Sequence, residues 1–401
     1  MEMAFMIIKP KILTFIRYYL PGYKAGGPLR SISNIVDNLS NDFEFWIITC
    51  DHDLGDDTQY ADISINEWTL VDKAHVFYAS SNQLTFKGIV KIIKDTPHDE
   101  IYLNSFFDSV FTIMPLLARR FGQLVDVPLL LAPRGEFSPG ALCIKPFKKK
   151  FYIYLANFLG LYKDIYWHAS TEYEVEDIKR AVLTINNTIL VALDLPTMMV
   201  FDQIPSEESD SNILRVVFLS RISPKKNLDY ALRILKQVTA QVVFDIYGPI
   251  EDDAYWQLCL GLCHAMPENI TITYRGGVLP KDVATTFADY DLFLFPTRGE
   301  NYGHVIAESL SVGTPVLLSN QTPWQNLEAD GLGWSLPLDD MVAFVNILES
   351  VAFQTKEDRY SMRKDIRQKI SERLFNPELI EANKQLFYKS IKKLTTVNSH
   401  N

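Results

Sequence analysis

The sequence predicts an α/β protein built from two doubly wound domains that face each other across a cleft. Short apolar runs rich in β-branched and aromatic residues alternate with amphipathic segments along the 401 residues, which is typical of parallel strands joined by crossover helices. This alternation stops at 195–212, where Pro, Ser and acidic residues accumulate, so the chain divides there. At about 150 residues per domain, the length also fits more than one domain.

The domain boundaries follow from this interruption. We expect a first domain at 1–197, a linker at 198–212 and a second domain at 213–376, with a final helix at about 377–395 that packs back on the first domain. The apolar runs are the predicted strands. Those of the first domain are 11–16, 43–49, 75–79, 101–104, 127–132, 165–169 and 188–192, and those of the second are 214–220, 242–248, 270–276, 291–296 and 315–320.

Composition excludes several classes of function. Hydrophobic residues make up 47% and charged residues 22%, which is typical of a globular chain. The 39 Lys and Arg against 49 Asp and Glu leave a net charge of −10, so we expect no nucleic-acid partner. The four Cys are scattered without a CxxC pair, which favours a reducing cytoplasm. No run approaches the roughly 20 uncharged apolar residues of a membrane span, so membrane contact is expected to be peripheral at most.

The segment 291–320 indicates a binding site. An apolar strand ends near Pro296, a polar loop follows, and a helix is expected to begin near Gly303. Backbone amides at the start of a helix bind phosphate oxygens, which makes 302–305 a predicted anion site. Glu300 and Glu308 place two carboxylates around this phosphate-sized pocket, where they can accept hydrogen bonds from sugar hydroxyls. Taken alone, the two residues have a simpler interpretation. Glu300 could merely favour the helix dipole, and Glu308 could be a solvated charge on the helix.

A second strand-to-helix junction carries three cations. Arg221, Lys225 and Lys226 follow the strand 214–220, in a loop before a helix that is expected to begin near Asn227. Cations at the carboxyl end of a strand can neutralise a diphosphate leaving group without a metal ion. A basic loop alone is usually only solvated. Together with the paired glutamates, however, it indicates a nucleotide diphosphate ligand.

These two segments carry a resemblance to a known family. GENYGHVIAESLSVGTPV, with seven residues between Glu300 and Glu308, and SRISPKKN, with Arg221 and Lys226 five apart, resemble the signatures of the retaining family 4 glycosyltransferases of bacterial surface-polysaccharide synthesis. Further segments agree in the same order, so the resemblance covers nearly the whole chain. Among them are LPGYKAGGPLRSI, LAPRGEFSPGAL, WHASTEYEVEDIKR and YRGGVLP.

The resemblance implies the GT-B fold, in which two Rossmann-like domains face each other and the second holds most of the sugar nucleotide. By the family pattern Glu308 holds the ribose, Glu300 the donor sugar hydroxyls, and the backbone of 302–305 the sugar or the diphosphate. Arg221 and Lys226 then neutralise the diphosphate as it leaves, so that neither a metal ion nor another cofactor is expected. The four backbone positions are Tyr302, Gly303, His304 and Val305.

The function implied is retaining transfer of a sugar from a nucleotide-diphosphate donor to a lipid-linked or saccharide acceptor, in surface polysaccharide biosynthesis. A UDP-sugar is expected ahead of a GDP-sugar, on family frequency. One alternative is a GT-B sugar-nucleotide epimerase, which needs side-chain acid and base groups around the sugar and no acceptor site. Another is a non-catalytic sugar-nucleotide-binding scaffold.

The first domain supplies further candidates. Gly26 and Gly27 lie in a glycine loop after the first strand, where the backbone can approach the donor. In many relatives a histidine follows the strand corresponding to 127–132, whereas this chain has Pro-Arg-Gly there. We expect Arg134 to take up part of that role, Glu136 to orient an acceptor hydroxyl, and His168 to reach the acceptor or sugar side. A buried His168 satisfied by the backbone is the alternative.

The DxD formed by Asp51, His52 and Asp53 invites a metal-dependent interpretation. It lies in an acidic loop after the second strand, of a kind that is common on protein surfaces. We therefore predict no metal site there.

The segment 140–163 is unusual in its charge, because it holds five lysines and no acidic residue, interleaved with aromatic residues. Clustered lysines gain about 1 kcal/mol each near anionic lipid, so a peripheral face on the inner side of the cell membrane is predicted there. The alternative is an ordinary amphipathic helix whose aromatic residues belong to the core and whose lysines are solvated. The lysines expected to face the membrane are Lys145, Lys148, Lys149 and Lys150.

Overall fold

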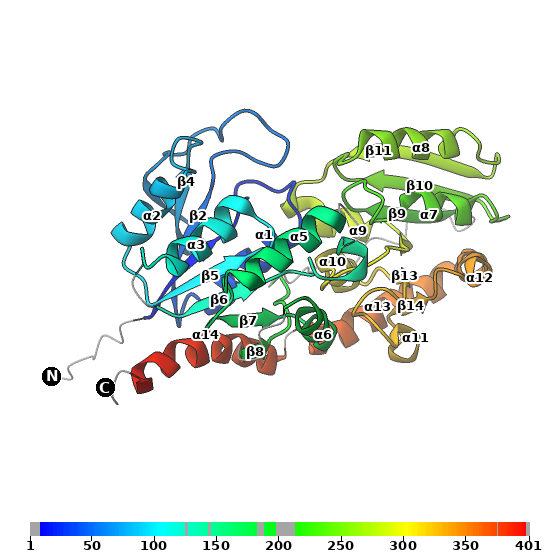
Figure 1. Cartoon of the computed structure of the whole chain (residues 1–401). Coiled ribbons are helices and arrows are strands. Elements are labelled where there is room, and N and C mark those ends of the chain that lie inside the picture. The colour runs from blue at the N-terminus through cyan, green and yellow to red at the C-terminus, as the bar shows by residue number, and fades with distance from the viewer. Residues whose placement is uncertain are drawn as a thin grey trace. The chain divides into compact units, whose positions relative to one another are not determined.

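The protein forms two compact α/β units, as the computed structural model shows (Figure 1). The first unit comprises Met1–Leu195 and Pro377–Asn401, and the second comprises Pro196–Asn376. The expected linker 198–212 lies outside the described residues. The structure describes residues 9–124, 127–142, 146–182, 188–197, 213–374 and 376–397.

An eight-stranded sheet runs through the described part of the first unit. Its strands are β1 (Lys11–Phe15), β2 (Glu44–Cys50), β3 (Trp68–Val71), β4 (Ala74–Ala79), β5 (Glu100–Asn104), β6 (Leu129–Ala132), β7 (Tyr166–Ala169) and β8 (Thr188–Val191). The order is β3-β4-β2-β1-β5-β6-β7-β8, and only the pair of β3 and β4 is antiparallel among these strands. The strand order therefore reverses between β1 and β5.

Helices cover both faces of this sheet, which makes the unit doubly wound. Helix α1 and the C-terminal helix α14 share a buried cluster on one face. Helices α2, α3, α5 and α6 contribute to the cluster on the other face. The helical segments are α1 (Gly27–Leu39), α2 (Phe86–Asp95), η1 (Ser109–Ile113), α3 (Met114–Arg120), α4 (Pro139–Leu142), α5 (Pro146–Phe158), α6 (Glu172–Ala181) and α14 (Pro377–Val397).

The second unit contains a six-stranded parallel sheet within its described residues. Its strands are β9 (Leu214–Leu219), β10 (Val242–Tyr247), β11 (Ile270–Gly276), β12 (Leu292–Phe295), β13 (Val316–Ser319) and β14 (Gly333–Leu336). The order is β11-β10-β9-β12-β13-β14, so it reverses between β9 and β12. The helical segments are α7 (Leu228–Leu235), α8 (Asp253–Cys263), η2 (Pro280–Asp282), α9 (Val283–Ala288), α10 (His304–Ser311), α11 (Leu327–Asp330), α12 (Met341–Ala352) and α13 (Lys356–Leu374).

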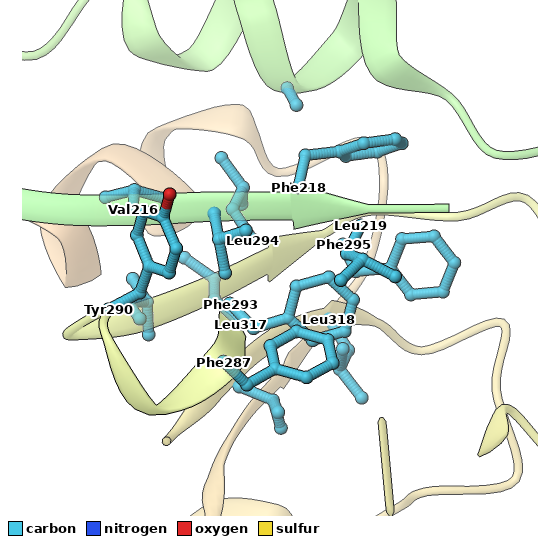
Figure 2. Packing of buried hydrophobic residues seen from close by; sticks show 14 of the residues in the cluster. Val216, Phe218, Leu219, Phe287, Tyr290, Phe293, Leu294, Phe295, Leu317 and Leu318 are labelled. Carbon is cyan, nitrogen blue, oxygen red and sulfur yellow. The ribbon is translucent and has the colours of Figure 1, made fainter. Parts of the chain in front are cut away.

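The central strands of the second unit are rich in apolar residues because helices cover both faces of the sheet. All four residues of β12 and all four of β13 are buried. Figure 2 shows this core, in which the rings of Phe287 and Phe293 lie 4.9 Å apart and those of Phe293 and Phe295 lie 5.2 Å apart. The core thus holds β12 firmly up to the residue at which the loop toward α10 begins.

The fold class predicted from the sequence is confirmed, and every predicted strand is present with ends within two residues of the expected ones. Two strands were missed. Strand β3 is a half-exposed, antiparallel strand at the end of the sheet, and β14 begins with Gly333 and lacks a strong apolar run. No helix of the described chain combines the length and the hydropathy that crossing a bilayer requires.

Helix α14 belongs to the first unit although it ends the chain. The ring of Phe387 lies 5.2 Å from that of Phe43 and 5.4 Å from that of Tyr102. Beside these apolar contacts, the first residue of β5 is Glu100, whose side chain is fully buried with Ser390 of α14 near it. Burial raises the pKa of Glu100 well above the ordinary value of 4.5, because the charged carboxylate would lose its hydration there.

We therefore expect stability to depend on pH through Glu100. As pH rises above 4.5, the unfolded chain releases a proton that the folded carboxyl keeps, so the unfolding free energy falls by about 1.4 kcal/mol per pH unit until the raised folded pKa is reached. Glu100→Gln should remove this loss, so that the stability of the variant relative to wild type increases as pH rises above 4.5 in denaturant titrations. Glu381→Gln, on the exposed side of α14, is the matched control. An advantage that does not change with pH would contradict the assignment.

Candidate active site

The predicted site residues of the second unit gather where its strand order reverses. Strands β9 and β12 are neighbours, and the chain continues from them to opposite sides of the sheet. The loops that follow both strands therefore emerge side by side at one edge. In open α/β sheets this edge is the position at which ligands bind.

An ion pair joins the two loops. Lys226 Nζ, from the loop after β9, lies 2.5 Å from Glu300 Oε1, from the loop after β12. Their side chains are only 12% and 11% exposed, and Nζ also lies 5.6 Å from the centre of the Phe295 ring. The sequence assigned these two residues to the same ligand, and the structure brings them into direct contact.

The pair keeps Glu300 ionised. Burial disfavours the carboxylate, but the charges of Lys226 and Lys225 and hydrogen bonds from Lys226 and Thr297 outweigh burial and hold the pKa of Glu300 below its ordinary value. Both contacts of the carboxylate with Lys226 and Thr297 are made by Oε1. Oε2 is therefore available to accept a hydroxyl hydrogen from a ligand.

Backbone contacts hold the loops in register around this pair. Arg298 N donates to Lys225 O at 2.9 Å, and the Asn227 side-chain amide donates to Pro296 O at 2.8 Å. Asn227 adopts a left-handed backbone conformation before α7, which turns the chain from the basic loop into the helix. Thr297 adds its hydroxyl at 3.2 Å from Glu300 Oε1. The hydrogen bond from Thr297 to Glu300 was not predicted, because nothing in the sequence distinguishes Thr297 from other loop threonines.

The start of α10 is built on Gly303. Its φ of 82° lies in the left-handed region, and a Cβ added there would come within 2.7 Å of Ile306 Cδ1, so a side chain would be strained and crowded. The preceding carbonyl, of Tyr302, accepts a hydrogen bond from Trp324 Nε1 at 2.6 Å. The rings of Tyr302 and His304 lie 4.9 Å apart, and both residues are buried. The amides of His304 and Val305 thus belong to the first turn of a helix, where intrahelical acceptors are lacking.

The other two predicted residues of this unit lie at its edge. Glu308 is partly exposed and lies in the second turn of α10. Arg221 follows β9 and donates from Nη1 to Glu251 Oε1 at 2.9 Å, so its guanidinium is turned toward the loop after β10. Burial is the main reason why the pKa of Lys226 is lowered. Arg221 remains close enough for its positive charge to lower that pKa further. Glu251 was missed because it is one of many acidic residues in surface loops.

In the first unit, the glycine loop is held by a residue of the DxD segment. The Asp53 carboxylate accepts hydrogen bonds from the amides of Tyr23 at 2.8 Å and Lys24 at 3.1 Å. Gly26 has a φ of 73° and precedes α1, and a Cβ on Gly27 would meet nothing within 4 Å. The backbone at Gly27 is thus open to approach. Across the described residues, no group of three or more His, Cys, Asp or Glu side chains is arranged to hold a metal ion.

Arg134 and His168 lie inside the first unit. The Arg134 guanidinium forms an ion pair with Asp194 and donates to Tyr102 Oη at 2.6 Å and to Asn104 Oδ1 at 3.0 Å. His168 is fully buried, with Nδ1 2.7 Å from Tyr102 Oη and Nε2 2.9 Å from the Ala192 carbonyl. Nε2 must carry the proton because it faces a carbonyl, so Nδ1 accepts from Tyr102.

These contacts change the roles expected of both residues. Burial and the Arg134 charge lower the pKa of His168 to about 4, so it stays neutral. Its geometry matches the alternative of a buried histidine satisfied by neighbours, and we assign Arg134 and His168 to the scaffold under the strand ends. Neither Tyr102 nor Asp194 was singled out from the sequence, because their partners are distant in the chain.

Glu136 also has internal partners. Its carboxylate accepts hydrogen bonds from the amides of Phe106 at 2.6 Å and Phe107 at 3.0 Å, and from Ser105 Oγ at 3.0 Å. These bonds tie the loop after β6 to the loop after β5. Burial, which these bonds only partly offset, raises the pKa of Glu136. The structure thus shows Glu136 as a residue that positions a loop.

The buried ion pair generates a prediction about stability. Lys226→Gln leaves Glu300 without its cation, and we expect it to lower the unfolding free energy of the second unit by about 3 kcal/mol, at the lower end of the cost of breaking a buried pair because the side chains keep some contact with water. Adding Glu300→Gln should restore much of the loss. A double-mutant cycle in denaturant measures the coupling, with the exposed Lys281→Gln as control. Additive effects of the two substitutions would contradict the interaction.

Comparisons with known proteins agree with this geometry. Residues 214–352 match the family model described as glycosyl transferases group 1. The chain is 25% identical over 332 residues to an uncharacterized 41.2 kDa protein in the cps region of Klebsiella pneumoniae, covering 81% of this chain and 87% of that protein. It is 27% identical over 141 residues to the O-antigen chain mannosyltransferase B of Escherichia coli, covering 34% of this chain and 36% of that protein.

A solved structure extends the likeness to the whole fold. Anabaena HepE, in a crystal structure with UDP-glucose, superimposes with a TM-score of 0.70 at 16% identity, covering 95% of this chain and 99% of that chain. The strand-end ion pair and the helix start lie within the residues that match the group 1 model. These findings support a glycosyltransferase with the two-domain GT-B fold.

Proposed function

We propose that the protein is a retaining, metal-independent glycosyltransferase of family 4, which transfers a sugar from a UDP-sugar to a lipid-linked or saccharide acceptor in cytoplasmic steps of surface polysaccharide biosynthesis. The observation that carries the proposal is the Lys226–Glu300 pair at the reversal of strand order, next to the start of α10. The pair holds a cation and a carboxylate in one place. A sugar diphosphate requires both, the cation for its phosphates and the carboxylate to accept a hydrogen bond from a sugar hydroxyl.

The donor is held by groups of the second unit. Glu308 accepts hydrogen bonds from the ribose hydroxyls, and Oε2 of Glu300 accepts one from the donor sugar. The first amides of α10, at Gly303, His304 and Val305, bind oxygens of the sugar or the diphosphate, helped by the positive end of the helix dipole. Gly26 and Gly27 of the first unit let the backbone approach the donor closely.

The reaction needs charge neutralisation more than a side-chain base. The bond between the anomeric carbon and the diphosphate oxygen breaks, and the acceptor oxygen bonds to the same face of that carbon. The acceptor proton passes to an oxygen of the departing diphosphate. Lys226 and Arg221 stabilise the negative charge that develops on this diphosphate, which is the service a metal ion would otherwise perform.

The names of similar proteins support the donor and the pathway class. HepE was crystallised with UDP-glucose, the Escherichia coli relative acts on an O-antigen chain, and the Klebsiella relative comes from a cps region. A transfer assay with a panel of UDP-sugars, read by mass spectrometry of the acceptor, tests the proposal. An epimerised sugar nucleotide formed from donor alone would instead indicate an epimerase, and donor binding without turnover would indicate a scaffold.

Glu308→Ala should lower kcat/KM by about 100-fold, because a carboxylate that accepts hydrogen bonds from two ribose hydroxyls contributes a few kcal/mol. The loss should appear mainly in the KM for the donor, since the ribose is remote from the breaking bond. Glu328→Ala, an exposed glutamate in α11, is the matched control. A kcat/KM for Glu308→Ala equal to that of the control would refute the ribose assignment.

Transfer should persist in excess EDTA, because protein cations and helix amides neutralise the diphosphate. The rate is measured before and after chelation, and again after adding back magnesium or manganese. Loss of activity that either metal restores would show that the diphosphate needs a metal ion, and would overturn this part of the proposal.

A further inference from the structure

Helix α5 of the first unit (Figure 1) carries several large, exposed apolar side chains. An exposed phenylalanine is unremarkable alone, but a contiguous row of them marks a surface that binds something. The exposed fractions are 88% for Phe147, 67% for Phe151, 70% for Tyr154 and 78% for Phe158.

The spacing of these residues places them on one face of the helix. They are four, three and four positions apart, so at 3.6 residues per turn they form a single stripe along the axis. The opposite face is already packed against the unit. Ala156 is buried there, and Tyr152 lies with its ring 5.8 Å from that of Phe107 and its hydroxyl 2.9 Å from that of Tyr162. The aromatic residues of the stripe are therefore not core residues, in contrast to the alternative considered from the sequence.

Lysines border the stripe on both sides. Helical geometry puts Lys148 about 100° to one side of Phe147 and Lys150 about 60° to the other, and both are exposed. Lys149 points inward instead, since its Nζ donates to the Ala141 carbonyl at 2.7 Å and lies 4.9 Å from the centre of the Phe107 ring. The expectation that Lys149 faces outward is thus wrong, and Lys145 lies outside the described residues.

We propose that the α5 face, formed by Phe147, Phe151, Tyr154 and Phe158 between Lys148 and Lys150, binds the surface of a membrane that contains anionic lipid. Aromatic side chains insert at the boundary between headgroups and acyl chains, while lysines beside them reach the lipid phosphates. This surface belongs to the first unit and the strand-end site to the second, and membrane binding does not depend on the proposed sugar transfer.

Charge decides between lipid and a second copy of the chain as the occupant. The segment 140–163 carries five lysines and no acidic residue in a protein of net charge −10. Two copies meeting through this face in antiparallel helix pairing would bring cationic borders together, which costs free energy, whereas an anionic bilayer complements both borders at once. A lipid surface is therefore the occupant that matches the apolar stripe and its charged rim together.

Co-sedimentation of the full chain with vesicles tests the proposal, using phosphatidylglycerol mixed with phosphatidylcholine and phosphatidylcholine alone. Wild type should pellet with the anionic vesicles, and less so as salt rises. Replacing Phe147, Phe151 and Phe158 by Ser should lower the partition coefficient about 100-fold or more. Lys148→Gln with Lys150→Gln should lower it about 30-fold on anionic vesicles and little on neutral ones.

Matched variants control for composition and folding. Phe353→Ser removes an 81% exposed phenylalanine from the second unit, and Lys87→Gln with Lys94→Gln removes two exposed lysines from α2. Both should pellet like wild type, and circular dichroism with thermal unfolding should be alike for all variants. Equal pelleting of wild type and the α5 variants would overturn the proposal. A second result would also overturn it: light scattering shows a wild-type dimer, and the triple Ser variant is monomeric but binds vesicles as wild type does. The α5 face would then join two copies of the chain.

Discussion

The arrangement of the strand ends in the second unit depends on the ion pair between Lys226 and Glu300. Moving a lysine and a glutamate out of water costs several kcal/mol for each ion, and only a partner at hydrogen-bonding distance offsets that cost. The loops after β9 and β12 must therefore stay together, and the backbone contact between Arg298 and Lys225 keeps them so. Since these strands adjoin at the reversal of strand order, the charges lie at the carboxyl ends of the strands, where open α/β sheets bind ligands.

The first unit shows the same construction with a different outcome. Arg17 and Asp108, 2.6 Å apart, join the loops after β1 and β5, where the order of that sheet also reverses. Deeper in the unit, Arg134 and Asp194 form an ion pair whose side chains are almost completely buried, and the guanidinium is surrounded by protein acceptors. Such a group can position strand ends but cannot turn to a ligand. The Lys226–Glu300 pair differs because the contacts with Lys226 and Thr297 use only Oε1 of the carboxylate. The pair can therefore position the strand ends and also present Oε2 to a ligand.

The fold was predictable because its signals are local. Apolar runs such as β12 and β13 are buried on both faces and stand out in any window of the sequence. Strands β3 and β14 escaped because one is a half-exposed antiparallel strand at the end of its sheet and the other has a glycine and few apolar residues. Of the candidate site, Lys226 and Glu300 were singled out through their motifs, and the structure brings them into contact. The hydrogen-bond partners of Arg134, His168 and Arg221 were not predicted, because contacts between residues far apart in the chain produce no regular spacing in the sequence.

Helix α5 shows where sequence periodicity stops being informative. Apolar residues occur on both faces of this helix, so no pattern distinguishes the face that packs on the sheet from the one that meets solvent. Packing decides it, because Ala156 and Tyr152 belong to the side that packs with the aromatic cluster around Phe106, while Phe147, Phe151 and Phe158 stay exposed. Exposing several phenylalanines to water forgoes about 1.5–3 kcal/mol of burial for each. No contact within the described parts of the unit recovers that free energy, whereas the proposed binding to a membrane surface would recover it.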